Sequence, residues 1–569
     1  MSSRDRRRWF TAGVVAALGG GLVAGVVPTA TAARDGIAGF TDQRVEWRAC
    51  AERPPLDPSE EPDEGIVFDP WQGQWGQAEC ATVIVPLDYR RPGDGSLSIG
   101  ISRIKAADPA LRKGVVLLNP GGPGGGGLSM PLQTRGSELA KHFDVIGFDP
   151  RGVGRSSALK CERIPDTRPR TTRPTDEEFA AYTEYARAHE DACRRAGGGI
   201  RPFINTANTA RDMDVIRAVL GESKINYVGY SYGTYLGAVY GSLFPRRLNR
   251  SVLDSSVHPD WLWREQGKQQ SVAARFNVEQ WATWVARRDD TYHLGKTLAE
   301  VLATTEALAA RLATRSVPLT LERPENWPTY WPRAFDRTVL DQFLARATQP
   351  RSVWDVTAEV VAEVRRAAEE GTAVSADAST AVGLVQEQGI VKVDDGVYDT
   401  VTCEADWPTD LATYHRDMRT FRERYPYSDG NGSGVIGAAP DNCTFRSFTP
   451  PEKLVPLRRD GYPTGLVIQA DGDPATQYDS GPAMAAKLGN QLISVRDSGV
   501  HGHYGTNRCV TEKVDDYLIH GVLPPSRSEC ADEPRPAVPA DGFAAGARSA
   551  VRDTKADRVR AAVGDTFWR

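Results

Sequence analysis

The sequence predicts an α/β fold, in which a mostly parallel sheet carries helices on both faces and accepts a large inserted helical cap. Short apolar runs at 114–118 and 143–148 have the length of strands that are buried on both faces. Helical segments alternate with such runs, and this order builds a parallel sheet. From about 256 to 461 amphipathic helices dominate, and strands resume at 464.

Each element is predicted from its own pattern. The strand at 81–89 alternates polar and apolar residues, and 97–104 is its hairpin partner. A helix is expected at 206–220, where Asn208 or Thr209 can cap its start. The remaining predictions are the helices 234–244, 266–287, 296–315, 336–347, 353–370 and 480–488, and the strands 250–253, 464–470 and 492–496, of which the final one is expected to be the last strand.

These patterns divide the chain into five parts. Residues 1–32 are a signal peptide, 33–255 and 462–530 form the two parts of the sheet domain, 256–461 form the cap, and 531–569 are a loose tail that ends in a short helix. Eight of the thirteen tryptophans fall in the cap. Such residues can line a substrate cleft, but packing in the cap core is the more ordinary role for any single one.

The N-terminus has the composition of an export signal. Arginines between Arg4 and Arg8 precede a Gly-rich apolar stretch at 12–27, and Ala30-Thr31-Ala32 offers a cleavage site. Arg7-Arg8-Trp9-Phe10 resembles part of a twin-arginine signal. We therefore expect a secreted protein that has no membrane contact after cleavage. A membrane anchor is the alternative, for which the apolar run is short.

The cysteine content agrees with export. The chain has eight cysteines, an even number that suits disulfides in an exported protein. Pairing each cysteine with its nearest neighbour gives Cys50–Cys80, Cys161–Cys193, Cys403–Cys443 and Cys509–Cys530 as a hypothesis. Because no Cys-x-x-Cys occurs, a zinc site is not expected, nor is any cofactor. The formal charge of -5 argues against nucleic acid or an anionic membrane as a partner, and a monomer is expected.

The segment Gly229-Tyr230-Ser231-Tyr232-Gly233 joins a β-branched and aromatic run to a helix-compatible stretch. This is the layout of a nucleophile elbow, in which the chain turns sharply from strand to helix and exposes the serine oxygen at the sheet edge. The two glycines keep side chains out of the close approach between strand and helix. Ser231 is therefore the predicted nucleophile, although a Gly-rich chain can also produce the pattern by chance.

A serine nucleophile needs a base, and the base needs an orienting carboxylate. In this fold the chain order is serine, acid, histidine. Asp473 and His501 each follow the C-terminal end of a predicted strand, where sites in open α/β sheets gather. They are the predicted acid and base. The alternatives are Asp471 for the acid and His503 for the base. Asp254 also ends a predicted strand, but a hinge role at the cap suits it better than the role of the acid.

The glycine-rich run at 119–127 follows the buried strand at 114–118. In this fold such a loop supplies one N–H of the oxyanion hole, and the residue after the nucleophile supplies the other. We assign these donors to Gly122 and Tyr232. Losing one donor of this kind typically costs about 3 kcal/mol of transition-state stabilisation. A flexible surface loop is the alternative interpretation of the glycines.

Five motifs in one order resemble the secreted bacterial tripeptidyl aminopeptidases, which are α/β-hydrolase serine peptidases related to proline iminopeptidases. The resemblance spans about 45–530, with a TAP-like C-terminal region at 465–523. It implies an α/β-hydrolase fold, a triad of Ser231, Asp473 and His501, and release of tripeptides from free N-termini of peptides or proteins. The motifs are Asn119-Pro120-Gly121-Gly122-Pro123-Gly124, Phe148-Asp149-Pro150-Arg151-Gly152-Val153-Gly154-Arg155-Ser156, Gly229-Tyr230-Ser231-Tyr232-Gly233-Thr234, Asp473-Pro474-Ala475-Thr476 and His501-Gly502.

An enzyme of this kind must bind the ammonium group of its substrate. Glu404 and Asp406, beside Cys403, are the carboxylates we assign to this role, and an ordinary solvated acidic pair is the alternative. Two other function classes stay open. One is an esterase or other small-molecule hydrolase, since a fold does not choose the acyl group. The other is a catalytically inactive binding protein.

Overall fold

The computed structural model describes residues 30–52, 71–197, 199–320, 332–387, 395–428, 434–531, 534–542 and 553–564. The expected signal peptide, up to residue 29, lies outside this part of the chain, as do Trp327 and Trp331. Among the described residues, no helix combines the length and the apolar character that a membrane span requires.

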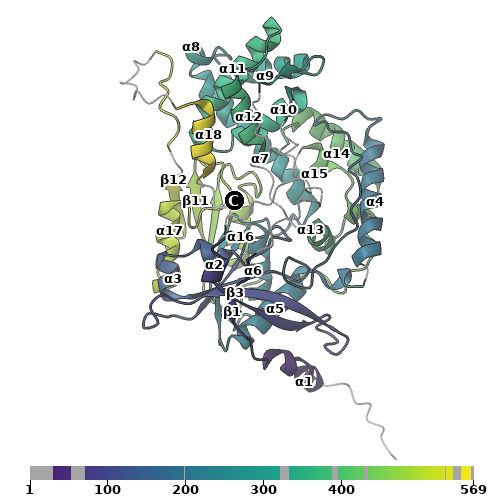
Figure 1. The fold of residues 1–569 in the computed structure, drawn as a ribbon, viewed down its shortest axis with the longest axis vertical. Coiled ribbons are helices and arrows are strands. Elements are labelled where there is room, and N and C mark those ends of the chain that lie inside the picture. The colour runs from purple at the N-terminus through teal and green to yellow at the C-terminus, as the bar shows by residue number, and fades with distance from the viewer. Residues whose placement is uncertain are drawn as a thin grey trace, which may run out of the picture.

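Within the described residues, ten strands form one sheet in the order β1-β2-β3-β5-β4-β6-β7-β10-β11-β12 (Figure 1). The strands from β5 to β12 in this order are parallel, and β1, β2 and β3 are antiparallel to their neighbours. The bounds are β1 Arg48–Ala49, β2 Glu79–Pro86, β3 Ser96–Ile104, β4 Val115–Asn119, β5 Asp144–Phe148, β6 Ile225–Tyr230, β7 Leu248–Asp254, β10 Leu466–Ala470, β11 Gln491–Arg496 and β12 Arg527–Ala531.

Helices cover both faces of the sheet, as predicted. Successive residues of a strand point to opposite faces. Val115 and Leu117 of β4 therefore join the core cluster that includes α5 and α6, whereas Val116 and Leu118 join the cluster that includes α3 and α17. The helices of the sheet domain are α1 Ala30–Thr41, α2 Met130–Gln133, α3 Glu138–His142, α5 Thr206–Val219, α6 Tyr232–Leu243, α16 Ser480–Leu488 and α17 Arg508–Asp515. The helix α4, Phe179–Gly197, packs instead against residues 411–439 of the helical region that follows β7.

A helical region lies between β7 and β10 in the chain and extends from one end of the sheet (Figure 1). Its own core contains Trp281, Trp284 and Trp354, each at most 3% exposed. These tryptophans therefore pack the cap rather than line a cleft. The elements are α7 Arg264–Ala286, α8 Asp289–Tyr292, α9 Leu298–Leu312, α10 Arg337–Ala347, α11 Trp354–Glu370, α12 Ala376–Glu387, α13 Asp395–Thr402, α14 Leu411–Arg424 and α15 Val435–Ala438, with a small β8 (Val317–Pro318) and β9 (Ala334–Phe335) hairpin.

The four disulfides predicted by nearest-neighbour pairing are all present: Cys50–Cys80, Cys161–Cys193, Cys403–Cys443 and Cys509–Cys530. The prediction that 492–496 is the last strand was wrong, because β12 follows and pairs with β11 in parallel. Only Ser528 and Cys530 of β12 are buried. An edge strand of this composition has no apolar run that the sequence could reveal.

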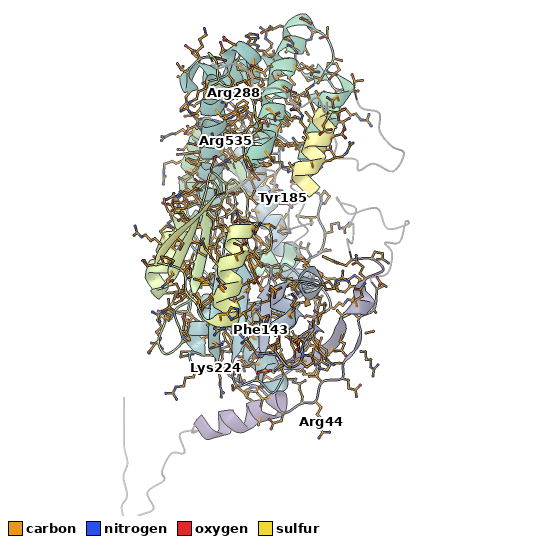
Figure 2. The ribbon with its side chains drawn as sticks, turned by 90° about the vertical axis from the view of Figure 1, so that its left-hand side faces the viewer. Arg44, Phe143, Tyr185, Lys224, Arg288 and Arg535 are labelled. Carbon is orange, nitrogen blue, oxygen red and sulfur yellow. A yellow bond between two sulfur atoms is a disulfide. The ribbon has the colours of Figure 1, made fainter. Side chains whose placement is uncertain are left out.

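The described part of the C-terminal tail runs along the cap. Arg288 Nε donates a hydrogen bond to the carbonyl of Val538 at 2.8 Å, and Arg535 pairs with Asp497 of the sheet domain. Both arginines lie toward the helical end of the molecule (Figure 2). The predicted short terminal helix is α18, Lys555–Gly564, and it packs against α12. Residues 534–542 therefore bridge the sheet domain and the cap instead of hanging loose.

A buried ion pair joins the loop after β5 to α5. Arg151 donates through Nε and Nη2 to the carboxylate of Asp212, at 2.7 and 2.6 Å, and neither side chain is more than 1% exposed. Tyr89 also donates to Asp212, at 2.7 Å. Arg151 bonds in addition to the carbonyls of Leu87 and Phe203. The pair thus fastens four segments of the sheet domain at one point.

Replacing Asp212 with alanine should lower the free energy of unfolding by about 3–5 kcal/mol, because the guanidinium of Arg151 is then buried without a counter-charge. Urea titration followed by tryptophan fluorescence measures this loss. The matched control is Glu512→Ala, which breaks an exposed pair with Arg508 and should barely move the midpoint. Equal effects of the two substitutions would contradict this account.

Candidate active site

Ser231 sits at a strained turn between β6 and α6. Its backbone has φ 57° and ψ -127°, a region that residues other than glycine rarely adopt. A Cβ on Gly229 would lie 2.4 Å from the carbonyl oxygen of Gly233, so only glycine fits this approach. All six residues of β6 are buried, whereas Ser231 is partly exposed. The chain therefore makes the sharp turn expected of an elbow and presents the serine at the sheet edge.

Asp473 and His501 contact each other at the same sheet edge. Asp473 follows β10 in the acid loop, residues 471–477, and His501 follows β11 in the histidine loop, residues 497–504. The Nδ1 atom of His501 lies 3.0 Å from each carboxylate oxygen of Asp473. The carboxylate is fully buried and also accepts the amides of Ala475 and Thr476, at 2.9 and 2.8 Å. These bonds hold it facing the imidazole.

The two groups shift each other's titration. Burial alone would raise the pKa of Asp473, but the adjacent His501 and the hydrogen bonds from Thr476 lower this pKa below its usual value. Burial alone would lower the pKa of His501, but the charge of Asp473, helped by Asp254, raises it above its usual value. Because Nδ1 faces the carboxylate, Nε2 is the nitrogen left to accept a proton from a hydroxyl group.

Asp471, the alternative acid, contacts the backbone of the histidine loop. Its carboxylate accepts the backbone amides of Asp497 and Ser498, at 2.9 and 3.0 Å, and so shapes the start of the histidine loop. His503, the alternative base, is only 1% exposed. The geometry therefore favours Asp473 over Asp471 and His501 over His503, and their catalytic roles stay predictions.

Asp254, at the end of β7, anchors both halves of the site. Its backbone carbonyl accepts the amide of Ser231 at 3.0 Å, and its carboxylate accepts the amide of His503 at 2.9 Å. The neighbouring Ser255 hydroxyl accepts the amide of Gly502 at 2.8 Å. The sequence predicts a hinge role at the cap for Asp254, which this geometry does not test. The signal for this anchor was its position as an acid that ends the strand beside the elbow strand.

The glycine-rich loop after β4 lies directly against the elbow. A Cβ on Gly121 would lie 2.5 Å from the carbonyl oxygen of Tyr230, 2.9 Å from the Cβ of Ser231 and 3.1 Å from the amide nitrogen of Tyr232. The next amide belongs to Gly122. Tyr232 is the first residue of α6, so its own amide has no acceptor within the helix. The two amides assigned to the oxyanion hole thus lie on adjoining segments beside Ser231.

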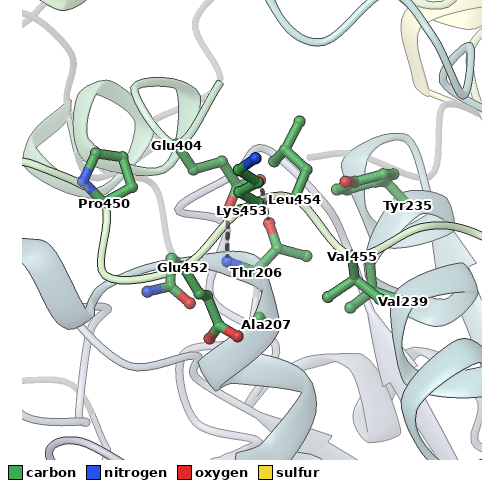
Figure 3. A pocket seen from close by; sticks show the side chains of 11 residues that line it. Thr206, Ala207, Tyr235, Val239, Glu404, Pro450, Glu452, Lys453, Leu454 and Val455 are labelled. Carbon is green, nitrogen blue, oxygen red and sulfur yellow. Dashed lines mark hydrogen bonds between the residues drawn. The ribbon is translucent and has the colours of Figure 1, made fainter. Parts of the chain in front are cut away.

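Glu404 lines a small pocket next to the elbow (Figure 3). Its carboxylate accepts the amide and the hydroxyl of Thr206, at 2.9 and 2.7 Å, and the same hydroxyl lies 2.8 Å from that of Tyr232. Burial raises the pKa of Glu404 to about 7. Asp406 is exposed and does not line this pocket. The structure therefore separates the two carboxylates that the sequence analysis had paired.

One group of residues in the described part of the chain resembles a metal site by proximity, namely His189, Cys193 and Asp399. Cys193 is bonded to Cys161 in a disulfide, so it has no thiolate to offer. His189 pairs with Asp399 at 3.2 Å. The donor set that remains is an ordinary histidine–carboxylate pair, which we interpret as structural.

Comparison with known proteins identifies the family. The pattern of the alpha/beta hydrolase fold matches residues 114–504. Over 560 residues the chain is 32% identical to the tripeptidyl aminopeptidase of Streptomyces lividans, in a match that covers 94% of this chain and 99% of that protein. The chain belongs to the α/β-hydrolase family. The expected resemblance to tripeptidyl aminopeptidases is therefore confirmed.

More distant relatives of this α/β hydrolase carry other names. The serine protease Hip1 of Mycobacterium bovis is 27% identical, over 86% of this chain and 91% of that protein. Carboxylesterase B of Mycobacterium tuberculosis is 28% identical, over 80% of this chain and 86% of that protein. The family thus includes proteins named for peptide and for ester hydrolysis.

Gly121→Ala should slow the reaction of this hydrolase with a fluorophosphonate by about a hundredfold or more, because a displaced loop would carry the Gly122 amide, the predicted oxyanion donor, out of place. The control is Gly136→Ala, which also has a positive φ but has no atom within 4 Å of the new Cβ. Labelling rates and thermal midpoints are measured for both variants. If both variants label as fast as the unaltered chain, the close packing of the loop is not needed.

Proposed function

We propose that this hydrolase is a secreted serine exopeptidase that releases tripeptides from free N-termini. The hydroxyl of Ser231 attacks the scissile carbonyl while Nε2 of His501 takes its proton. The C–N bond then breaks, and the imidazolium gives that proton to the leaving amine. Asp473 holds the imidazole in register and stabilises its charged form. Water, activated by the same histidine, then cleaves the ester and frees Ser231.

The oxyanion of each tetrahedral intermediate receives hydrogen bonds from the amides of Gly122 and Tyr232. Donors fixed in place before the reaction need no reorganisation as negative charge develops, which is why such sites lower the barrier strongly. The packing of Gly121 against Ser231 supports this assignment, because it brings the loop within contact distance of the nucleophile.

One observation carries the proposal: the bond between His501 and the buried Asp473, at the sheet edge where Ser231 follows β6. A buried carboxylate bonded to an imidazole, at the same sheet edge as a strained and partly exposed serine, matches the roles of a nucleophilic triad. The relative from Streptomyces lividans supports the choice of peptides as the substrate class. Four disulfides and the composition of residues 1–32 support secretion.

Glu404 supports the exopeptidase assignment as the binding group for the substrate ammonium. Its carboxylate accepts two hydrogen bonds from Thr206, which leaves lone pairs for a further donor. Glu404 is linked to the elbow through Thr206, whose hydroxyl donates to Glu404 and lies 2.8 Å from the hydroxyl of Tyr232. We assign no such role to the exposed Asp406.

Ser231→Ala should abolish release of the arylamine from a free-amine tripeptide-arylamide while leaving the circular dichroism spectrum unchanged. The unaltered enzyme should cleave this substrate, reject the N-blocked form and act more slowly on a short-chain ester. Faster cleavage of the ester than of the free-amine peptide would favour the esterase alternative, which the carboxylesterase relative keeps in view. Retained turnover by the variant would refute Ser231 as the nucleophile.

Activity should fall as the pH drops, for two separable reasons. The base form of His501 is lost as pH falls through a pKa above 6.5, which lowers kcat. The carboxylate of Glu404 is lost below about pH 7, which raises KM for free-amine peptides. Glu404→Gln should therefore raise KM about tenfold or more and remove the pH dependence of KM, but keep that of kcat. Asp406→Asn is the matched control, and equal KM values for the two variants would contradict the assignment.

A further inference from the structure

α7 of the cap carries three amide side chains along one face. Gln266, Gln270 and Asn277 are spaced by four and seven residues, so they line up on the same side of the helix. Gln266 is 7% exposed and Asn277 is fully buried. Buried amides must find hydrogen-bond partners. We call these three residues the amide stripe.

All three amides donate to the acid loop. Both glutamines donate through Nε2 to the carbonyl oxygen of Ala475, at 3.0 and 3.1 Å. Asn277 donates through Nδ2 to the carbonyl oxygen of Gly472, at 2.8 Å. Gly472 directly precedes Asp473, and Ala475 follows it by two residues. The amide stripe therefore binds the acid loop on both sides of Asp473, whose carboxylate faces His501.

Arg351 extends this grip to the histidine loop. It is 2% exposed and donates through Nη2 to the side-chain oxygen of Asn277 at 3.0 Å. A Cβ on Gly472 would lie 2.4 Å from Nη2, and a Cβ on Gly499 would lie 2.9 Å from Nη1. The guanidinium of Arg351 thus lies against both the acid loop and the histidine loop. The loops are also joined directly, because the amide of Gly472 donates to the carbonyl of Ser498 at 2.8 Å.

The position of the acid loop decides where the Asp473 carboxylate points. That carboxylate accepts the amides of Ala475 and Thr476, so it moves with the backbone that the amide stripe holds. A helix that only covered the sheet would need an apolar underside. Here the covering face is polar at the three points above the acid loop. Because a misplacement of about 1 Å at a reacting group can cost about a hundredfold in rate, this contact bears on the chemistry.

We propose that Gln266, Gln270 and Asn277 of α7, together with Arg351, are positioning residues through which the cap sets the alignment of Asp473 with His501. The inference rests on the proposed function, since Asp473 and His501 are two members of the proposed triad. The cap is then part of the catalytic apparatus.

The test compares Asn277→Ala and the double variant Gln266→Ala/Gln270→Ala with Gln269→Ala. Gln269 is the neighbouring glutamine on the same helix, and it donates to Glu265 one turn away, at 2.7 Å, rather than to the acid loop. With a free-amine tripeptide-arylamide, the two stripe variants should lose about 10- to 100-fold in kcat while KM stays within about twofold. The acid limb of the kcat profile should move to lower pH, because a displaced carboxylate raises the pKa of His501 less. Gln269→Ala should match the unaltered enzyme.

A purely structural role predicts a different result. The stripe variants would then have a lower thermal midpoint, but their kcat and the acid limb of their pH profile would equal those of Gln269→Ala. That result would overturn the proposal. If the buried Asn277 variant does not fold, the single variant Gln270→Ala, at a partly exposed position, carries the same comparison. Reaction rates with a fluorophosphonate give a second reading that does not depend on peptide specificity. If the unaltered chain labels at Ser231 but cleaves no peptide, the proposed function fails, while slower labelling of the stripe variants would still support the positioning role.

Discussion

The constraint on which the site depends is the anchoring of two distant loops to one buried acid, Asp254. Its carbonyl holds the amide of Ser231, and its carboxylate holds the amide of His503 across 249 residues of sequence. The side chain is fully buried, and burial raises its pKa, an effect that the nearby histidines and backbone amides only partly offset. Ser231 and the histidine loop therefore share one buried support.

The remaining supports of the site come from three directions. Asp471 shapes the histidine loop from the end of β10, and Ala475 and Thr476 fix the Asp473 carboxylate from within its own loop. The cap contributes the amide stripe of α7 and Arg351 from above. The tail contributes Arg535, which pairs with Asp497 at the start of the histidine loop. The C-terminal tail, to which the sequence assigns no role, therefore contacts the same loop that carries His501, the predicted base.

The sequence predicts those features whose structure is determined by contacts between residues close together in the chain. Strands β4 to β7 and the elbow follow from short patterns within one segment, and each disulfide joins cysteines that are neighbours in the sequence. The separate roles of Asp471 and Asp473, or of Glu404 and Asp406, do not, since the members of each pair are two residues apart and differ only in what other segments bring to them. β12 escaped prediction because an edge strand needs no apolar run, and the stripe on α7 escaped because its partners lie in a loop about two hundred residues away.

The central claim is that Ser231, His501 and the amides of Gly122 and Tyr232 converge on one reacting group. A crystal structure of the fluorophosphonate adduct tests this most directly. The account predicts phosphorus bonded to Ser231 Oγ, the phosphonyl oxygen within hydrogen-bond distance of both amides, and Nε2 of His501 facing the adduct. An adduct on another residue, or an imidazole turned away from Ser231, would contradict it.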